Sequence, residues 1–179
     1  MSYTTIKAIY PNDRTENLME LGNSHGSAPP VWEALSNKYL GTTASYVYPN
    51  MGYMQRLDEL WPLWKRLDIP EEYRLVLMLT FDRAYVAKKY YPRMFMAIDK
   101  FLTDFPPRLG TVNHWRKIMG VLHVQDGSEG VPGIGLHCTS VSDDPFLGPW
   151  NEEKDERDPP DWNEIYEICQ EIDGLKVTA

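Results

Sequence analysis

The sequence predicts an α+β fold: a mainly helical single domain over residues 1–179, with about six or seven helices around a small sheet. Helices are indicated by several segments in which apolar residues recur every three or four positions. Strands are indicated near both ends of the chain, over residues 3–10 and 134–141, and we expect these N-terminal and late-chain strands to pair. A chain of 179 residues, 42% of them hydrophobic, provides one core and leaves little room for a second domain.

The N-terminal segment predicts a strand followed by a short helix. Residues 3–10 are β-branched and aromatic, and the turn-forming residues 11–13 end this strand. Asp13 and Glu16 have the spacing of a capping box, which predicts a short helix through Leu21.

Two further helical segments precede the middle of the chain. The prolines at 29 and 30 suit a first helical turn and Gly41 suits a helix stop, so the residues between them are expected to form an amphipathic helix. From Met54 to Leu67 the apolar spacing stays helical across Pro62. We therefore expect a kink, or two short helices in one line.

The middle of the chain predicts a buried central helix. It opens near Pro70 and runs through Tyr91, and residues 75–79 are apolar on every side. Phe81 is expected to lie in the core as part of this helix. Pro92 breaks or restarts the helix, and apolar spacing then continues to the prolines at 106 and 107.

The last third of the chain predicts a helix, a strand and a C-terminal helix. Thr111 is a candidate cap for the first helix, and residues 134–141 alternate like a half-buried strand. Residues 143–161 form an acidic connector, which we expect to be exposed. Asp161 and Glu164, spaced as a capping box, then predict the start of the last helix.

Negative charge is concentrated at the C-terminal end. The formal net charge is −8, yet residues 1–142 carry 15 basic and 14 acidic residues, whereas residues 143–179 carry 3 basic and 12 acidic ones. Such asymmetry points to a basic protein partner, or to contact with the chain's own basic residues. The expected binding residues are Asp143, Asp144, Glu152, Glu153, Asp155, Glu156 and Asp158.

Residues 22–26, GNSHG, match the G-x-S-x-G pattern of a nucleophile elbow, in which a serine stands between a strand and a helix. The preceding residues favour a helix, and 23 residues are too few for the parallel strands of an α/β-hydrolase. We therefore expect no catalytic residue and interpret the segment as a loop that leads into a helix. The alternative is a small hydrolase with Ser24, Asp126 and His137 as its catalytic residues.

The sequence contains no spacing typical of a metal or cofactor site. His114 and His123 are nine residues apart, so on one helix they would point to opposite sides. We expect no metal; the alternative is a site assembled from His137, Asp143 and Asp144. No phosphate-binding loop or dinucleotide fingerprint is present, so we also expect no cofactor.

Composition and the first residues indicate in which cellular compartment the protein is expected. No apolar run approaches the roughly 20 residues of a membrane span, and the first residues lack the pattern of a secretory signal. Two cysteines are too few for a disulfide scaffold. We therefore expect a reduced, cytoplasmic protein that does not enter a membrane.

The expected function is non-enzymatic. The basic residues Arg83, Lys88, Lys89 and Arg93 lie among tyrosines, as in a nucleic-acid face, but an acidic tail would repel phosphates, so direct nucleic-acid binding is disfavoured. We expect an interaction, inhibitor or accessory protein of the kind found in phages and mobile elements. Its acidic C-terminal surface and aromatic anchors would bind a basic partner, and the hydrolase described above is the alternative.

Overall fold

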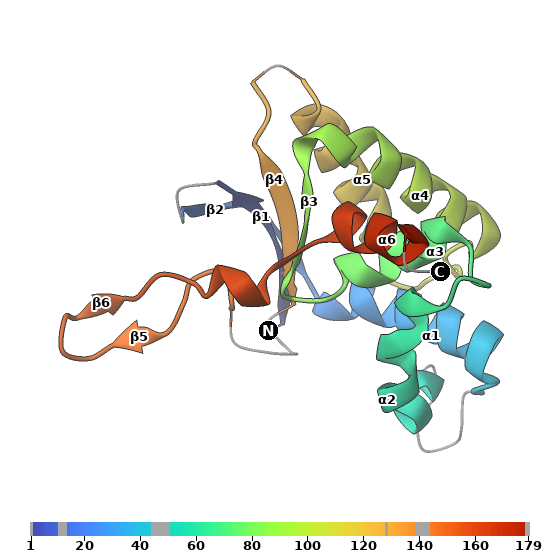
Figure 1. The fold of residues 1–179 in the computed structure, drawn as a ribbon. Helices are drawn as coiled ribbons and strands as arrows, with labels where there is room; N and C mark the ends of the chain where they lie inside the picture. Colours follow the sequence, from blue (N-terminus) through green and yellow to red (C-terminus); the bar gives the residue numbers. More distant parts are fainter. Residues whose placement is uncertain (1, 11–13, 44–50, 128, 139–143, 178–179) are drawn as a thin grey trace.

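The computed structural model describes residues 2–10, 14–43, 51–127, 129–138 and 144–177. They form an α+β fold in which the helices lie mainly on one side of a mixed sheet (Figure 1). The strands are β1 (Tyr3–Ile9), β2 (Thr15–Gly22), β3 (Ala84–Ala87), β4 (Gly133–Cys138), β5 (Trp150–Asn151), β6 (Glu156–Arg157) and β7 (Tyr166–Glu167). The α-helices of the described residues are α1 (Ala28–Leu40), α2 (Leu57–Leu60), α3 (Glu71–Leu79), α4 (Tyr91–Asp104), α5 (Trp115–Gln125) and α6 (Ile168–Val177).

The main sheet has the strand order β2-β1-β4-β3-β7, and only the β3–β7 pair is parallel. The predicted pairing of the N-terminal and late-chain strands is confirmed: β1 and β4 are antiparallel, from Thr4 opposite Cys138 to Ile9 opposite Gly133. Strands β5 and β6 form a separate hairpin.

The predicted helix over residues 13–21 is wrong, because these residues supply β2, which pairs antiparallel with β1. The capping-box spacing of Asp13 and Glu16 is a local signal only, and Asp13 lies outside the described residues. Pairing with β1 buries Leu21 and outweighs the local helical preference.

The predicted central helix is shorter than expected. Helix α3 ends at Leu79, where the Thr80 hydroxyl and backbone N–H both donate to the Leu77 carbonyl, at 2.6 and 3.0 Å. The chain then turns and enters β3, which pairs with β4 and β7. Phe81 is therefore only half-buried, outside any helix.

The other helices differ from prediction mainly at their ends. Helix α1 ends at Gly41, which has φ +67°, as expected. The segment before α3 is a series of short helices, as the helical spacing across Pro62 predicts: two 3-10 helices, Gly52–Arg56 and Trp61–Lys65, flank α2.

Helix α5 begins at Trp115 rather than after Thr111, whose hydroxyl instead donates to the Arg108 carbonyl at 2.7 Å. The Asp161 carboxylate accepts from the Asn163 backbone N–H at 3.0 Å and so caps a 3-10 helix (Trp162–Glu164). The C-terminal helix α6 starts only after β7.

Both faces of strand β4, in the middle of the sheet, are covered. Helices α3, α4 and α5 build the core on one face, and residues 144–148 lie over the other. All six residues of β4 are buried, so the prediction of a half-buried strand is wrong. Phe146 packs over Gly135, where a Cβ atom would lie 2.8 Å from the phenyl ring. Within the described residues, no helix is both long and apolar enough to span a membrane.

Candidate functional site

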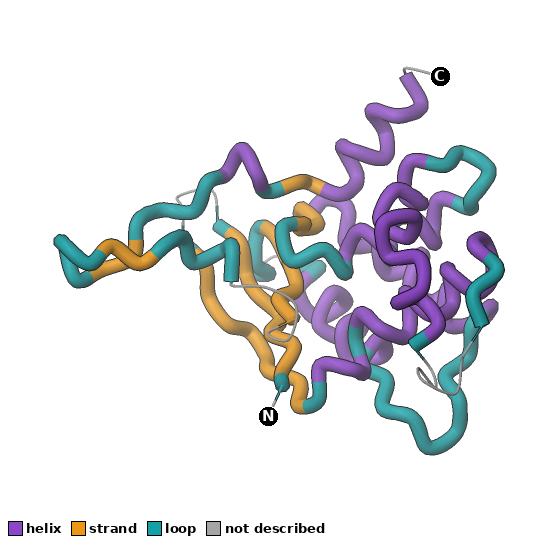
Figure 2. The backbone as a smooth tube through the Cα atoms, turned by 90° about the horizontal axis from the view of Figure 1, so that it is seen from below, coloured by secondary structure: helices purple, strands orange, loops and turns teal. Residues whose placement is uncertain are grey.

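The hairpin of β5 and β6 projects from the body, away from the helices, in both Figure 1 and Figure 2. We call residues 148–158 the acidic arm. At its neck Gly148 has φ +67°, and a Cβ atom there would lie 2.1 Å from the Asp158 carbonyl oxygen, so only glycine fits. The Asp158 backbone N–H donates to the Pro149 carbonyl at 3.0 Å, and the Arg157 guanidinium donates to the Gly148 carbonyl at 2.8 Å. The arm is thus closed at its neck by hydrogen bonds to two backbone carbonyls.

Asn151 organises the turn of the acidic arm. Its side-chain oxygen accepts from the backbone N–H groups of Glu153 and Lys154, at 3.1 and 3.2 Å. Its side-chain nitrogen donates to the Asp158 carboxylate at 2.9 Å, and the Lys154 ammonium donates to the same carboxylate at 2.9 Å. Lys154, and then Asn151, lower the pKa of Asp158. Asp158, one of the predicted binding residues, therefore holds the arm together.

The outer surface of the arm is acidic and carries one exposed indole. Glu152, Glu153, Asp155 and Glu156 are exposed, and the ion pairs between described residues use none of their carboxylates. Trp150 is 54% exposed at the start of β5. Four unneutralised carboxylates and an exposed aromatic ring thus stand on one ordered projection.

Arg83 and Arg93, two residues of the predicted basic face, pair with acidic residues outside the arm. Arg83 pairs with Glu164. Arg93 donates to Glu71 at 2.6 Å and to Asp173 at 2.8 Å, and these hydrogen bonds raise the pKa of Arg93. Arg83 does not lie on the central helix as predicted, because α3 ends at Leu79 and Arg83 directly precedes β3.

The loop that contains Ser24 is held by the start of α5. The His114 ring nitrogen Nε2 donates to the carbonyls of Gly22 and Asn23, at 3.0 and 2.9 Å. The Trp115 indole N–H donates to the Ser27 carbonyl at 2.7 Å. Ser24 follows a strand after all, contrary to the sequence prediction, but it is 2% exposed.

Two of the alternative catalytic residues, Ser24 and Asp126, lie apart from each other. The loop of Ser24 contacts the first residues of α5, whereas Asp126 follows its last residue, roughly 16 Å away along an 11-residue helix. The His137 ring nitrogen Nδ1 lies 3.7 Å from a carboxylate oxygen of Asp144 instead. This arrangement places Asp126 beyond reach of the Ser24 loop.

The alternative metal ligands His137 and Asp144 do come together, but beside Lys7, a residue of strand β1. The buried Lys7 ammonium lies 2.5 Å from the Asp144 carboxylate and donates to the Asn17 side-chain oxygen at 3.0 Å. Asp143 lies outside the described residues. In the part of the chain that the structure describes, no three His, Cys, Asp or Glu side chains are grouped to hold a metal. The cluster therefore fastens residues 144–148 to the sheet.

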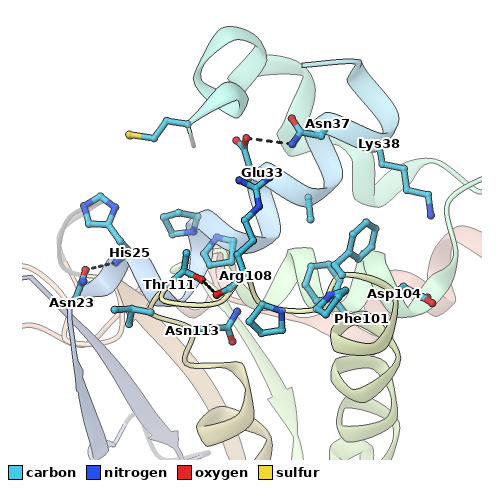
Figure 3. Close-up of a pocket in the computed structure, with 18 residues that line it drawn as sticks. Asn23, His25, Glu33, Asn37, Lys38, Phe101, Asp104, Arg108, Thr111 and Asn113 are labelled. Atoms are coloured by element: carbon cyan, nitrogen blue, oxygen red, sulfur yellow. Dashed lines mark hydrogen bonds between the residues drawn. The ribbon is translucent and has the colours of Figure 1, made fainter. Parts of the chain in front are cut away.

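A groove of about 970 Å³ lies between α1, the end of α4 and the following loop (Figure 3). Sequence reasoning missed it, although prolines at 29, 30, 106 and 107 flank the two helices that form it. Figure 3 shows the Arg108 side chain extending across the groove toward Glu33. The Lys38 ammonium lies 5.0 Å from the centre of the Tyr73 ring. The groove contains charges of both signs and so favours neither an anion nor a cation. Its lining residues are Asn23, His25, Pro29, Pro30, Glu33, Ala34, Asn37, Lys38, Met51, Phe101, Asp104, Phe105, Pro106, Pro107, Arg108, Thr111, Val112 and Asn113.

Comparisons of the chain with protein-family models, with curated proteins and with solved structures find no match in any of the three.

Proposed function

We propose that this chain is a non-catalytic binding protein whose acidic arm docks on a basic surface of a partner protein. The observation that carries this proposal is the ordered projection of four exposed carboxylates that the described ion pairs leave unneutralised. Exposed charge of one sign speeds encounter with a surface of opposite sign. Because the hydrogen bonds of Asn151 and Asp158 fix the arm in advance, binding would cost less conformational entropy than ordering a loose tail.

Trp150 supplies the apolar part of the proposed interface. Tryptophan is enriched among the residues that contribute most to binding energy, and an indole more than half exposed on a projection is available for burial. The carboxylates would set the rate and orientation of encounter, and the indole would slow dissociation.

We extend the proposal to an inhibitor or accessory protein of the cytoplasm. The two cysteines are buried free thiols, which supports a reducing compartment. An arm that covers a basic surface would exclude that surface's other ligands by charge and bulk, without chemistry of its own.

The test compares two variants with the same change of net charge. The arm variant carries Glu152→Gln, Glu153→Gln, Asp155→Asn and Glu156→Gln. The control variant neutralises four exposed acids elsewhere: Glu20→Gln, Asp58→Asn, Asp99→Asn and Glu171→Gln. A photo-reactive amino acid at position 150 captures partners from a lysate of the source organism for identification by mass spectrometry. Surface plasmon resonance with the purified partner then measures association at two salt concentrations.

We expect the arm variant to associate at least about tenfold more slowly at low salt, with a flatter salt dependence, because exposed charge mainly steers encounter. The control variant should behave like the wild type. Equal association rates and equal salt dependence in all three proteins would overturn the proposal.

A further inference from the structure

A surface with basic and apolar side chains lies where the loop between α4 and α5 enters the first turn of α5. We call it the α5 patch, and its residues are Leu109, Val112, Arg116 and Lys117. All four are exposed, Leu109 fully and Val112 by 46%. The ion pairs and the cation–π contacts between described residues use neither Arg116 nor Lys117. The patch therefore presents two cations that the described chain leaves unneutralised, beside two apolar groups.

Short contacts hold the loop and the start of α5 together. The Thr111 backbone N–H and hydroxyl both donate to the Arg108 carbonyl, at 3.1 and 2.7 Å, and fold the loop. Val112 and His114 meet at Gly26, where a Cβ atom would lie 2.7 Å from Val112 Cγ1 and 2.8 Å from the His114 ring. Because His114 directly precedes α5, the apolar residues of the loop adjoin the two cations. The α5 patch is thus ordered before any partner binds, which lowers the entropic cost of binding.

The charge of the α5 patch does not serve the stability of the helix. The first turn of a helix lies at the positive end of its dipole, where acidic side chains are favourable and cations are unfavourable. Helix α5 has two cations in this turn and no acid. The cations oppose the helix dipole and remain exposed, so they are available to an acidic partner.

The acidic arm has the chemistry that the α5 patch lacks. It presents four exposed carboxylates and the indole of Trp150, which is 54% exposed. Contact between the two surfaces would pair opposite charges and bury apolar groups from both sides, as at a protein interface. The arm projects away from the helices in Figures 1 and 2, and no ion pair between described residues joins it to α5. The match is therefore between the arm of one molecule and the α5 patch of another.

We propose that the basic partner of the arm is a second copy of this chain, whose α5 patch receives the arm. This inference rests on the proposed function and names its partner. The arm and the α5 patch are different surfaces, so each copy presents its arm to one neighbour and its patch to another. The formal net charge of −8 repels copies from each other, but residues 1–142, which include the patch, carry 15 basic and 14 acidic residues. Association therefore depends on local attraction, and we expect it to be weak and to rise with concentration.

The test measures self-association by sedimentation velocity over a series of protein concentrations. The arm variant and its charge-matched control are those described above. The patch variant carries Arg116→Gln and Lys117→Gln, and its control carries Lys65→Gln and Lys89→Gln, which neutralise two exposed cations elsewhere. We expect the arm and patch variants to associate at least about tenfold more weakly than their own controls. The arm variant is the sharper case, because removing four negative charges reduces the general repulsion between copies and should still weaken their association.

A mixture of the two defective variants tests the direction of the contact. The patch variant keeps an acidic arm and the arm variant keeps a basic patch, so an equimolar mixture should form a heterodimer that neither variant forms alone. Such a heterodimer has no further charged arm and patch to pair, so assembly should stop there. Position 150 then reports the surface that the arm meets. Isotopically labelled protein with a photo-reactive amino acid at this position should cross-link to residues 109–117 of unlabelled protein.

A wild type that stays monomeric at every concentration, equal association of the variants and their controls, or cross-links to another surface would overturn the inference. None of these results decides the arm proposal, which is tested with a partner captured from the lysate. A different protein captured through position 150, and bound more slowly by the arm variant, would support the arm proposal and refute a second copy as its partner.

Discussion

The first prediction tests whether the GNSHG segment around Ser24 is a structural loop held in place by His114. Gly26→Ala adds a Cβ atom that would lie 2.7 Å from Val112 Cγ1 and 2.8 Å from two atoms of the His114 ring. Val112 is 46% exposed and can move aside, but His114 is 5% exposed and bonds two carbonyls of the loop. The added methyl group must therefore displace the ring that holds the loop.

The expected cost follows from these contacts. Overpacking a well-packed site typically costs about 1–3 kcal/mol, and the one His114 N–H, shared between the two carbonyls, contributes about 1 kcal/mol net. Because the ring can shift without losing both bonds completely, we expect Gly26→Ala to lower the free energy of unfolding by about 2–4 kcal/mol. That is a large part of the ~5–15 kcal/mol typical of a folded domain.

The assay is urea denaturation followed by fluorescence, with Gly22→Ala as the control. Gly22 belongs to the same motif, has no atom within 4 Å of an added Cβ and does not have positive φ, so its substitution should change stability by less than about 1 kcal/mol. A nucleophile elbow would need small residues on both sides of its serine. A Gly26→Ala variant within about 0.5 kcal/mol of the wild type would refute this account of the loop.

Two further predictions concern the thiols and the arm. Burial raises the pKa of both Cys138 and Cys169 to about 12. Ellman's reagent at pH 8 should therefore leave the native protein unmodified and detect two thiols in 6 M guanidinium; rapid reaction of the native protein would contradict this. The Lys154 ammonium lowers the pKa of Asp158, so this contact stabilises the arm above the ordinary aspartate pKa of about 3.9 and is lost as the pH falls through the lower folded value. Trp150 fluorescence should change in that acid range, and the change should be absent in Asp158→Asn.

The sequence predicted the elements that are specified locally. Helix α1 carries its prolines in the first turn, and Gly41 adopts the positive φ that ends it. Four of the seven residues of strand β1 are β-branched, and its pairing with β4 followed from the shortage of other strands. In each case the signal lies within the element itself.

The missed strands are specified by their neighbours instead. The four residues of β3 follow a strongly helical segment, and pairing with β4 and β7 decides their conformation. The arm and the groove show the same contrast between features specified locally and features that depend on distant residues. The acidic composition of the arm was visible, but its hairpin depends on Asn151 bonding Asp158, and the groove of Figure 3 joins Asn23 to Asn113 across the chain. Contacts of this range leave no periodic signal in the sequence.

The acidic residues of the C-terminal segment fall into two groups that composition alone could not separate. Glu164 and Asp173 pair with Arg83 and Arg93, so part of the excess charge is neutralised within the molecule.

The carboxylates of the arm are held away from those cations by the hairpin itself, which brings like charges together at a cost to its own stability. Closing the neck at Gly148 and bonding Asp158 offset that cost. Neutralising the arm should therefore leave the hairpin at least as stable while weakening association with a basic partner. Charge that opposes folding yet is kept in place by dedicated contacts is what the docking role proposed for the arm requires.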